Sequence, residues 1–490
     1  MKFRSIPLIL FIIFVFSCDN NKVSNSETND NNENNRSIVV FYTNDEHGWI
    51  ENSAYTDGAA RMLGLWRQND GYDGADNFLI LSGGDNWTGP AISTWFEGES
   101  TVDVMNAMEY DASAIGNHEF DFRIEGLYER IEQADFPYLS ANIREKASGE
   151  IPDFASPYII REIEGIMVGI IGLTSLTTPY STFPDHVADY DFINYTIALN
   201  EIVPNVIEDG AELLIVIAHI CRSEMLELAT ILIDLGISAI GGGHCHDELV
   251  SQIISNSHGD VAVIKSSSNM RSYAKLEITY DIVEKEVVKM EPSANLNEDG
   301  NSDQSVADVV SYWRAQTDAE LSGVIGYTDN EIMKESNAMH NMVVDSWLYK
   351  YPSADIALTN SGGIRQSIPA GDITKETLIG VLPFQNYIIE LQLTGSELIE
   401  CIGNDNIIVG GMTTQGGYFL ADGTVISNNS TYNVLTTDYL YARSDFPFSE
   451  YDPDPYYTSL NYHQPTIDWI VSLNTSAVNP LDLYLDNNSR

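Results

Sequence analysis

The sequence has few cysteines and few basic residues for its length. Its 490 residues include 4 cysteines, and 24 Lys and Arg residues stand against 72 Asp and Glu residues, for a formal net charge of −48. Such a charge disfavours binding to nucleic-acid polymers and to anionic membrane surfaces. If the substrate is an anion, metal ions or a few well-placed arginines must attract it. The length allows two or three domains with large cores.

Long apolar runs are missing after the N-terminus, so we predict no transmembrane segment there. Residues 6–16, "IPLILFIIFVF", follow Lys2 and Arg4 and have the length of a signal peptide, too short to span a bilayer. The run ends at "VFSC", which resembles the lipobox of bacterial lipoproteins. We therefore predict a signal peptide over 1–17 and a lipidated Cys18 that anchors an exported protein in the cell envelope, in the periplasm or at the cell surface. An ordinary secretory signal with an incidental cysteine is the alternative.

The residues after Cys18 predict a disordered tether over 18–36. Eight of the eighteen residues from 19 to 36 are asparagines, and almost none is apolar. Without Cys18 the chain keeps Cys221, Cys245 and Cys401, an odd number that argues against a full disulfide framework. Cys221 and Cys245 could pair if their strands are neighbours, but we expect free buried thiols.

Apolar β-branched runs with polar ends alternate with helical stretches from residue 37 onward, which predicts an α/β layered core. The expected strands cover 37–45, 77–85, 112–119, 166–174, 212–219 and 237–244. A β-rich stretch follows, then a polar break at 297–304 and a helix over 306–321. We predict a catalytic domain over 37–300, a linker helix within 301–324 and a second domain over 325–485.

Metal-type side chains follow five of these strands. If the strands lie parallel in one sheet, their ends bring these groups to one edge. Imidazole, carboxylate and amide groups suit zinc, manganese or iron. About eight such donors are too many for one tetrahedral ion and suit two ions about 4 Å apart that share a carboxylate. The candidates are Asp45, His47, Asp85, Asn117, His118, Asp121, His219, His244 and His246.

Each of these motifs alone has a simpler explanation. A lone histidine at a strand end is usually a hydrogen-bonded structural residue. An Asp or Asn after glycine is usually a helix cap or turn residue, and Asp121 could cap a helix that begins near Ile124. Five such motifs in succession, each after an apolar run, favour a metal site.

The order D-x-H, GGD, GNHE-x-D, AH and GGH-x-H resembles the calcineurin-type metallophosphoesterases. "TNSGGIR" and "LPF" resemble the C-terminal substrate domain of the 5′-nucleotidases. The resemblance implies a layered α/β/β/α sandwich plus a second α+β domain. It implies two divalent ions, zinc or manganese, that activate the attacking water. One ion would be held by Asp45, His47, Asp85 and His246, and the other by Asp85, Asn117, His219 and His244.

The same resemblance assigns roles to other residues. His118 would stabilise the transition state or protonate the leaving oxygen, and Asp121 would orient its ring. Cys245 stands where the family commonly has Ser or Thr, and we expect it to be a bystander. The expected substrate residues are Asn360 and Arg365 on the phosphate or ribose side, Phe384 and Tyr439 as rings that sandwich the base, and Asp445 near the sugar or base.

Two departures from the family pattern concern the substrate. "RSDFPF" replaces a glycine-rich "GGDG", and Lys334 stands in for an arginine expected upstream. The function predicted is hydrolysis of nucleoside 5′-monophosphates. The enzymatic alternatives are a 2′,3′-cyclic phosphodiesterase/3′-nucleotidase and a broad nucleotide or UDP-sugar hydrolase. An inactive nucleoside-binding surface lipoprotein is the alternative from another class. A nucleotide is the expected partner, and the sequence does not indicate an oligomeric state.

Overall fold

The computed structural model describes residues 33–246, 249–403 and 406–490. The predicted signal peptide, the lipidation site Cys18 and most of the predicted tether lie outside the described residues. Among the helices of the described part, none is both long and apolar enough to cross a membrane.

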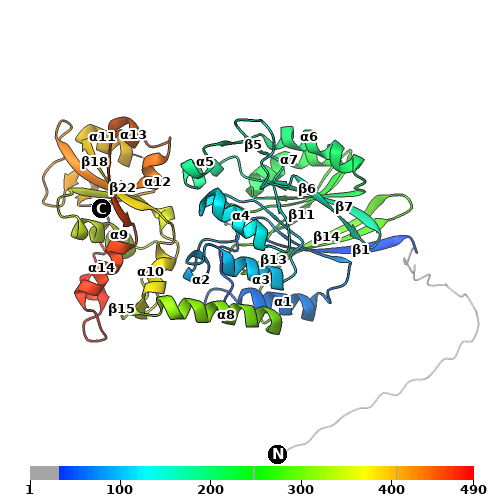
Figure 1. Cartoon of the computed structure of the whole chain (residues 1–490), viewed down its shortest axis with the longest axis horizontal. Helices are drawn as coiled ribbons and strands as arrows, with labels where there is room; N and C mark the ends of the chain where they lie inside the picture. Colours follow the sequence, from blue (N-terminus) through cyan, green and yellow to red (C-terminus); the bar gives the residue numbers. More distant parts are fainter. Residues whose placement is uncertain (1–32, 247–248, 404–405) are drawn as a thin grey trace, which may run out of the picture.

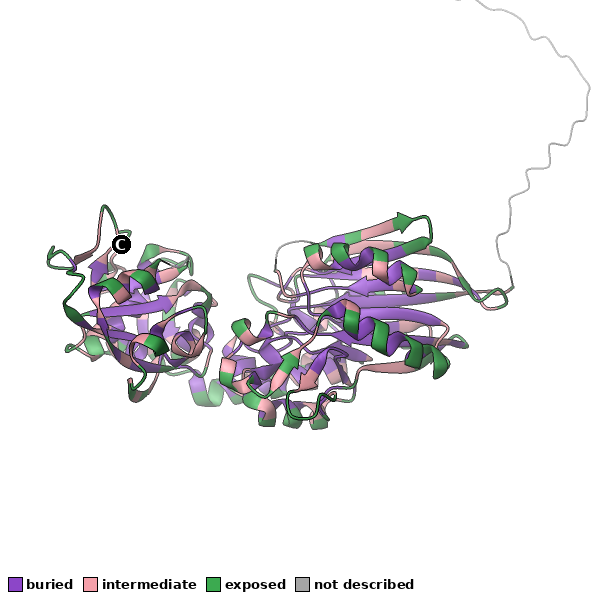
Figure 2. Cartoon of the chain, turned by 90° about the horizontal axis from the view of Figure 1, so that it is seen from above, coloured by how far each residue is buried: buried purple, intermediate pink, exposed green. Residues whose placement is uncertain are grey.

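The chain forms two bodies joined by one long helix (Figure 1). Strands β1 to β14 and strands β15 to β23 belong to separate sheets. Helix α8, Gln304–Leu321, runs from the first body to the second. Strands and inward helix faces are buried in both bodies, while the outer helix faces are exposed (Figure 2).

Two six-stranded sheets build the first body. One has the order β14 (Glu286–Leu296), β13 (Ser272–Asp281), β1 (Asn35–Thr43), β2 (Phe78–Ser82), β3 (Ala112–Ala114) and β4 (Tyr138–Leu139). The other has the order β11 (Val250–Asn256), β12 (Gly259–Lys265), β10 (Ile237–Gly241), β9 (Leu213–Ala218), β7 (Ile166–Leu173) and β6 (Tyr158–Ile163). Strands β1 to β4 are parallel, and so are β7, β9, β10 and β12.

The sheets pack face to face because alternate residues of each strand point to opposite faces. Val40 of β1 and Ile215 of β9 belong to one core between the sheets. Phe41 of β1 and Val216 of β9 face helices on the outside. The predicted α/β/β/α sandwich is therefore confirmed. The expectation that the metal-type strand ends share one sheet is wrong, because β1, β2 and β3 lie in one sheet and β9 and β10 in the other.

Helices cover both outer faces of this sandwich. The first sheet is covered by α1 (Gly58–Asn69), α3 (Glu99–Ala107), α4 (Arg123–Gln133) and part of α8, and the second by α6 (Tyr195–Glu208) and α7 (Arg222–Asp234). The shorter elements are α2 (Ala91–Thr94), η1 (His118–Phe120), β5 (Ile143–Glu145), α5 (Thr178–Ser181), η2 (Pro184–Val187) and β8 (Tyr190–Phe192).

A mixed five-stranded sheet forms the centre of the second body. Its order is β19 (Ile407–Gly410), β16 (Ile356–Asn360), β22 (Thr431–Thr437), β18 (Tyr387–Thr394) and β23 (Tyr456–Asn461). Helices α9 (Asn337–Lys350), α10 (Lys375–Val381) and α14 (Gln464–Leu473) contribute to one of its cores, and α11 (Gly395–Ile402), α12 (Asp438–Ala442) and α13 (Phe448–Tyr451) to the other. The small elements are β15 (Val324–Thr328), β17 (Gly371–Thr374), β20 (Met412–Thr413), β21 (Phe419–Leu420), η3 (Ser361–Gly363) and η4 (Leu481–Tyr484).

Helix α8 contacts both bodies. Asp303 caps its N-terminus by accepting hydrogen bonds from the backbone N–H groups of Ser305 and Val306. Trp313 of α8 donates to Asp103 of α3 at 3.0 Å, whereas Arg314 forms a two-bonded ion pair with Glu376 of α10 at 2.6 and 2.9 Å. The helix predicted over 306–321 is present, and its contacts fix where the two bodies meet.

Candidate metal centre

The turns after three strands hold candidate ligands in a left-handed backbone conformation. Asp45 and His47 after β1 have φ values of 54° and 46°, Asp85 after β2 has 58°, and His244 after β10 has 67°. Non-glycine residues adopt this conformation at a cost of about 1–3 kcal/mol each, and such residues cluster at functional sites. The space is also tight, since a Cβ on Gly243 would lie 3.0 Å from His219 Nδ1. The left-handed conformation of these turns therefore directs the four candidate side chains toward one place.

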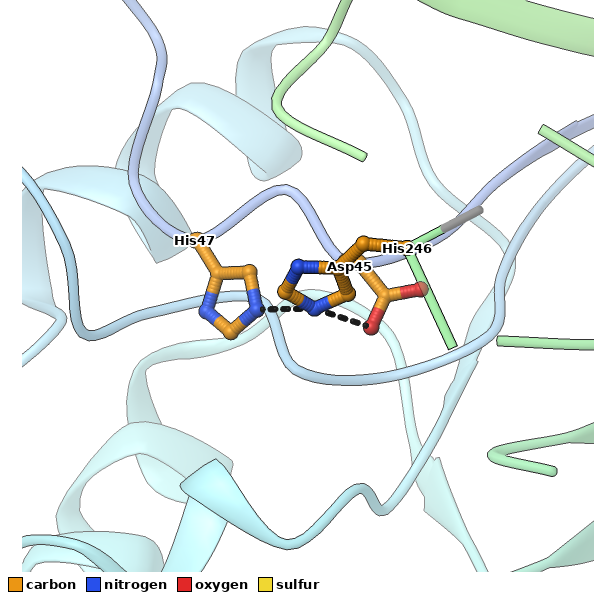
Figure 3. Close-up of side chains that lie close together, drawn as sticks. All are labelled: Asp45, His47 and His246. Carbon is orange, nitrogen blue, oxygen red and sulfur yellow. Dashed lines mark hydrogen bonds and ion pairs between the residues drawn. The ribbon is translucent and has the colours of Figure 1, made fainter. Parts of the chain in front are cut away.

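The first cluster joins Asp45, His47 and His246 (Figure 3). The Nε2 atoms of His47 and His246 lie 3.0 Å apart, and His246 Nε2 lies 3.3 Å from Asp45 Oδ1. Asp45 and His47 are buried, while His246 keeps 38% of its side chain exposed. The cluster thus lies at the edge of the fold, where one side remains accessible.

The second cluster joins Asp85, Asn117, His219 and His244. His219 Nε2 lies 2.9 Å from Asp85 Oδ2, 3.2 Å from Asn117 Oδ1 and 3.2 Å from His244 Nδ1. Asp85 Oδ2 also lies 4.0 Å from His47 Nε2 of the first cluster. Asp85 therefore lies between the side chains of the two groups, although it comes from one sheet and His219 from the other.

Hydrogen-bond acceptors converge in these clusters. His219 directs Nδ1 at the carbonyl oxygen of Gly83 at 2.8 Å, so Nδ1 carries a hydrogen and Nε2 faces the oxygens of Asp85 and Asn117. Both oxygens are acceptors, and so is Nε2 whenever the ring is neutral. His47 repeats the arrangement, with Nδ1 facing the carbonyl oxygen of Thr88 at 3.1 Å. Such convergence requires a proton or a metal cation among the lone pairs, and the donor set fits borderline divalent ions.

The charges of the two aspartates favour a cation. Burial opposes their ionisation, but His246 holds the pKa of Asp45 well below its usual range, and His219 and His118 do the same for the pKa of Asp85. Both carboxylates are therefore negative at neutral pH. Burial also lowers the pKa of His219, but the Asp85 carboxylate outweighs burial and raises this pKa to about 10. Burial and then His219 lower the pKa of His244 to about 4, which keeps its ring neutral.

His118 lies beside the clusters and is paired with Asp121. Its Nδ1 lies 2.7 Å from Asp121 Oδ2, and its backbone N–H donates to Asp85 Oδ1 at 2.8 Å. Burial opposes the charged ring, but Asp121 and then Asp85 raise the pKa of His118 above its ordinary value. Helix α4 begins at Arg123 without a side-chain cap, so Asp121 serves His118 and not the helix. Thr182 fixes the second oxygen of Asp121 with a 3.1 Å hydrogen bond.

A cavity of about 450 Å³ opens over the clusters between the two bodies. The first body contributes Asp85, Asn117, His118, His244 and His246, among others. The second body contributes Asn360, Arg365, Phe384 and Tyr439, four of the five predicted substrate residues. Arg365 Nη2 lies 3.3 Å from His47 Nε2, and the Phe384 ring stacks on His118 with 5.7 Å between centroids. The expected metal side and substrate side therefore meet at one cavity.

Comparison with known proteins finds similarity to the 5′-nucleotidases. Residues 315–421 match the family described as 5′-nucleotidase, C-terminal domain. A 5′-nucleotidase of Vibrio parahaemolyticus is 25% identical over 456 residues, which cover 81% of this chain and 80% of the relative. The human 5′-nucleotidase is 28% identical over 408 residues, which cover 74% of this chain and 70% of the relative. The chain is similar to two-domain 5′-nucleotidases over most of its length, and residues 315–421 match their C-terminal domain.

A solved structure shows that the fold extends beyond the matched segment. The 5′-nucleotidase precursor of Thermus thermophilus superposes with a TM-score of 0.77 over 90% of this chain and 97% of that chain, at 23% identity. The matched segment 315–421 includes Asn360, Arg365 and Phe384 but ends before Tyr439. The His and Asp clusters lie in the first body, outside this segment.

One predicted substrate residue lies elsewhere. Asp445 is not among the residues that line the cavity; its carboxylate instead accepts hydrogen bonds from Arg443, whose side chain does line it. In the loop "RSDFPF", the arginine therefore lines the cavity in place of the acidic residue that was expected there. Lys334 lines a neighbouring cavity of about 480 Å³. His246 and Arg365 line both cavities, and His47 of the first cluster also lines the second cavity.

Three residues that shape the site were not predicted from the sequence. Glu119 is fully buried and accepts hydrogen bonds from the backbone N–H groups of Asp85 and Asn86, both at 2.8 Å. Burial and then Asp85 raise the pKa of Glu119 to about 7. Thr177 contacts His244 Nε2 at 3.0 Å, and Arg443 lines the cavity. Glu119 stands inside the "GNHEFD" motif and could have been found there, whereas Thr177 has no sequence signal.

The expectation of free buried thiols at Cys221 and Cys245 is wrong. The two residues form a disulfide, with Cα atoms 5.1 Å apart. Cys221 caps α7 after β9, and Cys245 follows β10, which pairs with β9 in the sheet. This is the neighbouring-strand arrangement that permits pairing. The sulfur of Cys245 is thereby engaged away from metal binding. Cys401 is the free, buried cysteine of the described residues.

Proposed function

We propose that the chain hydrolyses nucleoside 5′-monophosphates to nucleoside and phosphate at a two-metal centre. The observation that carries this proposal is the shared cavity, around which the His and Asp clusters, Arg365 and two aromatic rings all lie. The clusters suit a phosphate bound to cations, and the rings suit a base, since every base offers a π-face. Nucleotides combine the two groups in one molecule.

The proposed ligands follow the two clusters. Asp45, His47, Asp85 and His246 would hold one ion, and Asp85, Asn117, His219 and His244 the other, with zinc or manganese as the metals. Bound divalent ions would supply Lewis acidity and an activated water nucleophile at this site. Hydrogen bonds to backbone carbonyl oxygens fix the rings for this task, since Gly83 orients His219 and Thr88 orients His47.

Other residues of this chain would act on the substrate directly. Arg365 reaches His47, so its guanidinium is placed to bind phosphate oxygens beside the clusters. Asp121 accepts a hydrogen bond from His118 Nδ1, which leaves Nε2 of the cavity-lining His118 to contact the leaving oxygen. Phe384 and Tyr439 line the same cavity from the second body. A base would stack between them, and Asn360 would contact the ribose or phosphate.

A substrate panel with defined metals tests the proposal. The protein is stripped with a chelator, reloaded separately with Zn²⁺ and Mn²⁺, and assayed for phosphate release from AMP, 3′-AMP, 2′,3′-cyclic AMP and UDP-glucose. We expect loss of activity after chelation, recovery with one of the metals, and the highest kcat/KM for AMP. A preference for the cyclic ester or for UDP-glucose would replace the substrate assignment. Adenosine binding without turnover of any ester would make the protein a binding lipoprotein.

We also propose export and attachment of the mature chain through lipidated Cys18. The apolar run 6–16 and the "VFSC" sequence support this proposal. The test expresses the full chain and its Cys18→Ala variant in a bacterium and separates the membrane fraction from the soluble fraction. We expect the parent to require detergent for release and the variant to be released without it. Equal release of both would contradict the anchor.

A further inference from the structure

The loop after α12 brings an arginine to the base side of the cavity. Arg443 directly follows α12 and lines the cavity together with Tyr439 and Phe384. It belongs to the "RSDFPF" segment, where the 5′-nucleotidase pattern has glycines. A cationic, planar side chain therefore occupies a position at which the family pattern offers no side chain.

The guanidinium of Arg443 is held in one orientation. Its Nε donates to Asp445 Oδ1 at 2.8 Å, and Nη2 donates to Asp445 Oδ2. Nη1 donates to the hydroxyl of Tyr439 at 3.0 Å. The guanidinium carbon lies 5.6 Å from the ring centroid of Tyr439 and 5.4 Å from that of Phe446. Contacts on several sides leave the group little freedom, so it is preorganised before any ligand binds.

These contacts leave part of the guanidinium available. The group has five N–H donors and no acceptor, and Asp445 and Tyr439 take three of the five. One N–H on each terminal nitrogen has no partner within the described part of the chain. Two N–H groups, one on each terminal nitrogen of a fixed plane, can bind neighbouring acceptors on a ligand.

The phosphate of a nucleotide has a different partner. Arg365 contacts His47 of the metal cluster, whereas Arg443 contacts residues of its own loop and Tyr439 of α12. Tyr439 is also the ring proposed to stack against the base. Arg443 therefore lies beside the base and away from the scissile phosphate.

We propose that Arg443 reads the edge of the base and selects nucleotides whose base presents acceptors there. Guanine presents O6 and N7 as neighbouring acceptors, whereas adenine presents an amino donor beside N7; uracil presents an acceptor at O4, where cytosine presents a donor. This inference rests on the proposed function. The preferred substrates are 6-oxopurine nucleotides such as GMP and IMP, over AMP, and UMP is preferred over CMP. Asp445 is the positioning residue that holds the fork.

A base-preference assay with matched variants tests this selection. kcat/KM is measured for GMP, IMP, AMP, UMP and CMP on the metal-loaded parent and on Arg443→Gln, Arg443→Lys, Asp445→Asn and, as a control for loss of one surface charge, Arg161→Gln. Arg161 is exposed on β6 and is absent from the cavity lining. We expect the parent to favour GMP over AMP by about tenfold or more. The ratio should collapse in both Arg443 variants, because lysine keeps the charge but not the fork.

The remaining outcomes separate the inference from the proposed function. Asp445→Asn should lower the GMP to AMP ratio without abolishing AMP turnover, and Arg161→Gln should leave the ratio unchanged. Binding of guanosine and adenosine, measured by calorimetry on the same proteins, should show the same preference without any turnover. Hydrolysis of every nucleotide with a ratio near one, unchanged in Arg443→Gln, would overturn the base-reading role alone. Absence of hydrolysis of any nucleotide would overturn the proposed function instead.

Discussion

Cys221 and Cys245 form a disulfide that joins the two segments carrying three candidate ligands. His219 lies two residues before Cys221, and His244 and His246 flank Cys245. The bond therefore restrains the ligands of both clusters through the covalent chain. It also fits an exported protein, because disulfides persist in oxidising compartments.

Removal of this disulfide should weaken both the fold and metal binding. The bond closes a loop with a sequence separation of 24 residues, so the Cys221→Ser/Cys245→Ser variant should lose about 3 kcal/mol of unfolding free energy. Metal affinity should fall as well, because the turn with His244 and His246 gains freedom. Denaturant titrations and calorimetric metal titrations measure both quantities, with Cys401→Ala as the matched cysteine control. Parent-like stability and affinity in the double variant would contradict this role.

Asp85→Asn should disturb both metal sites at once. The Asp85 carboxylate contacts His219 at 2.9 Å and lies 4.0 Å from His47, so one substitution removes negative charge from both clusters while keeping the side-chain size. We expect the bound metal to fall from two ions per chain to at most one, and turnover to fall by at least about a hundredfold. Elemental analysis and phosphate-release assays give the two numbers. Asp234→Asn is the matched control, since Asp234 pairs with His258 at the surface; two bound ions in the Asp85 variant would refute the bridging role.

Strand positions were predictable because long apolar runs with polar ends mark buried parallel strands. The pairing of those strands was not, since a buried run gives no sign of the sheet it joins; β2 (FLILS) and β9 (LLIVIA) are both apolar runs but lie in different sheets. Nine metal-type candidates could be named from their types and spacing. The left-handed turns at Asp45 and Asp85 could not, because such a conformation is imposed by tertiary contacts and is uncommon for residues other than glycine.

On the substrate side, most residues could be named from short motifs, but the surroundings of one of them could not. Phe384 and Arg365 sit inside short motifs that family resemblance could transfer, and both line the cavity. The role of Asp445 was transferred in the same way. In this chain Arg443, two positions earlier, donates hydrogen bonds to the Asp445 carboxylate, so Asp445 has other surroundings than the motif implies. Motif matching compares single positions, whereas the role of a side chain depends on its neighbours in space.

His118→Ala should slow turnover while leaving both metals bound. His118 contacts Asp85 through its backbone N–H, which the substitution keeps, and its ring pairs with Asp121. Loss of a general acid typically costs about 10²–10⁴ in kcat. Asp121→Asn should cause a smaller loss of kcat, because the ring remains but loses its charged partner. Steady-state kinetics with metal analysis tests this, with His258→Ala as the control for a surface histidine; an unchanged kcat in His118→Ala would remove that residue from the mechanism.

Asp438 should make stability depend on pH independently of the metal centre. Its side chain is largely buried, lines the cavity beside Tyr439, and accepts hydrogen bonds from the backbone N–H groups of Tyr387 and Tyr439, both at 2.9 Å. Burial dominates over these two bonds, and Asp185 adds to it, so the pKa of Asp438 rises from 3.8 to about 6. The folded state therefore binds this proton more tightly than the unfolded state does. The contribution of Asp438 to stability is most favourable below pH 4 and is lost as the pH rises through about 6.

Asp438→Asn removes this titration while keeping an acceptor for the two backbone N–H groups. The unfolding free energy of the variant relative to the parent should therefore rise between pH 4 and pH 6, by up to about 3 kcal/mol, and stay constant above pH 7. Urea denaturation at closely spaced pH values measures the difference, and Asp468→Asn, which removes a surface carboxylate of the same body paired with Lys350, serves as the comparison. In that variant the change has the opposite sign and falls below about pH 4, because burial raises the pKa of Asp468 but its hydrogen bond with Lys350 outweighs burial and lowers this pKa from 3.8. A flat difference between Asp438→Asn and the parent across this range would show that the carboxyl titrates normally in the folded protein.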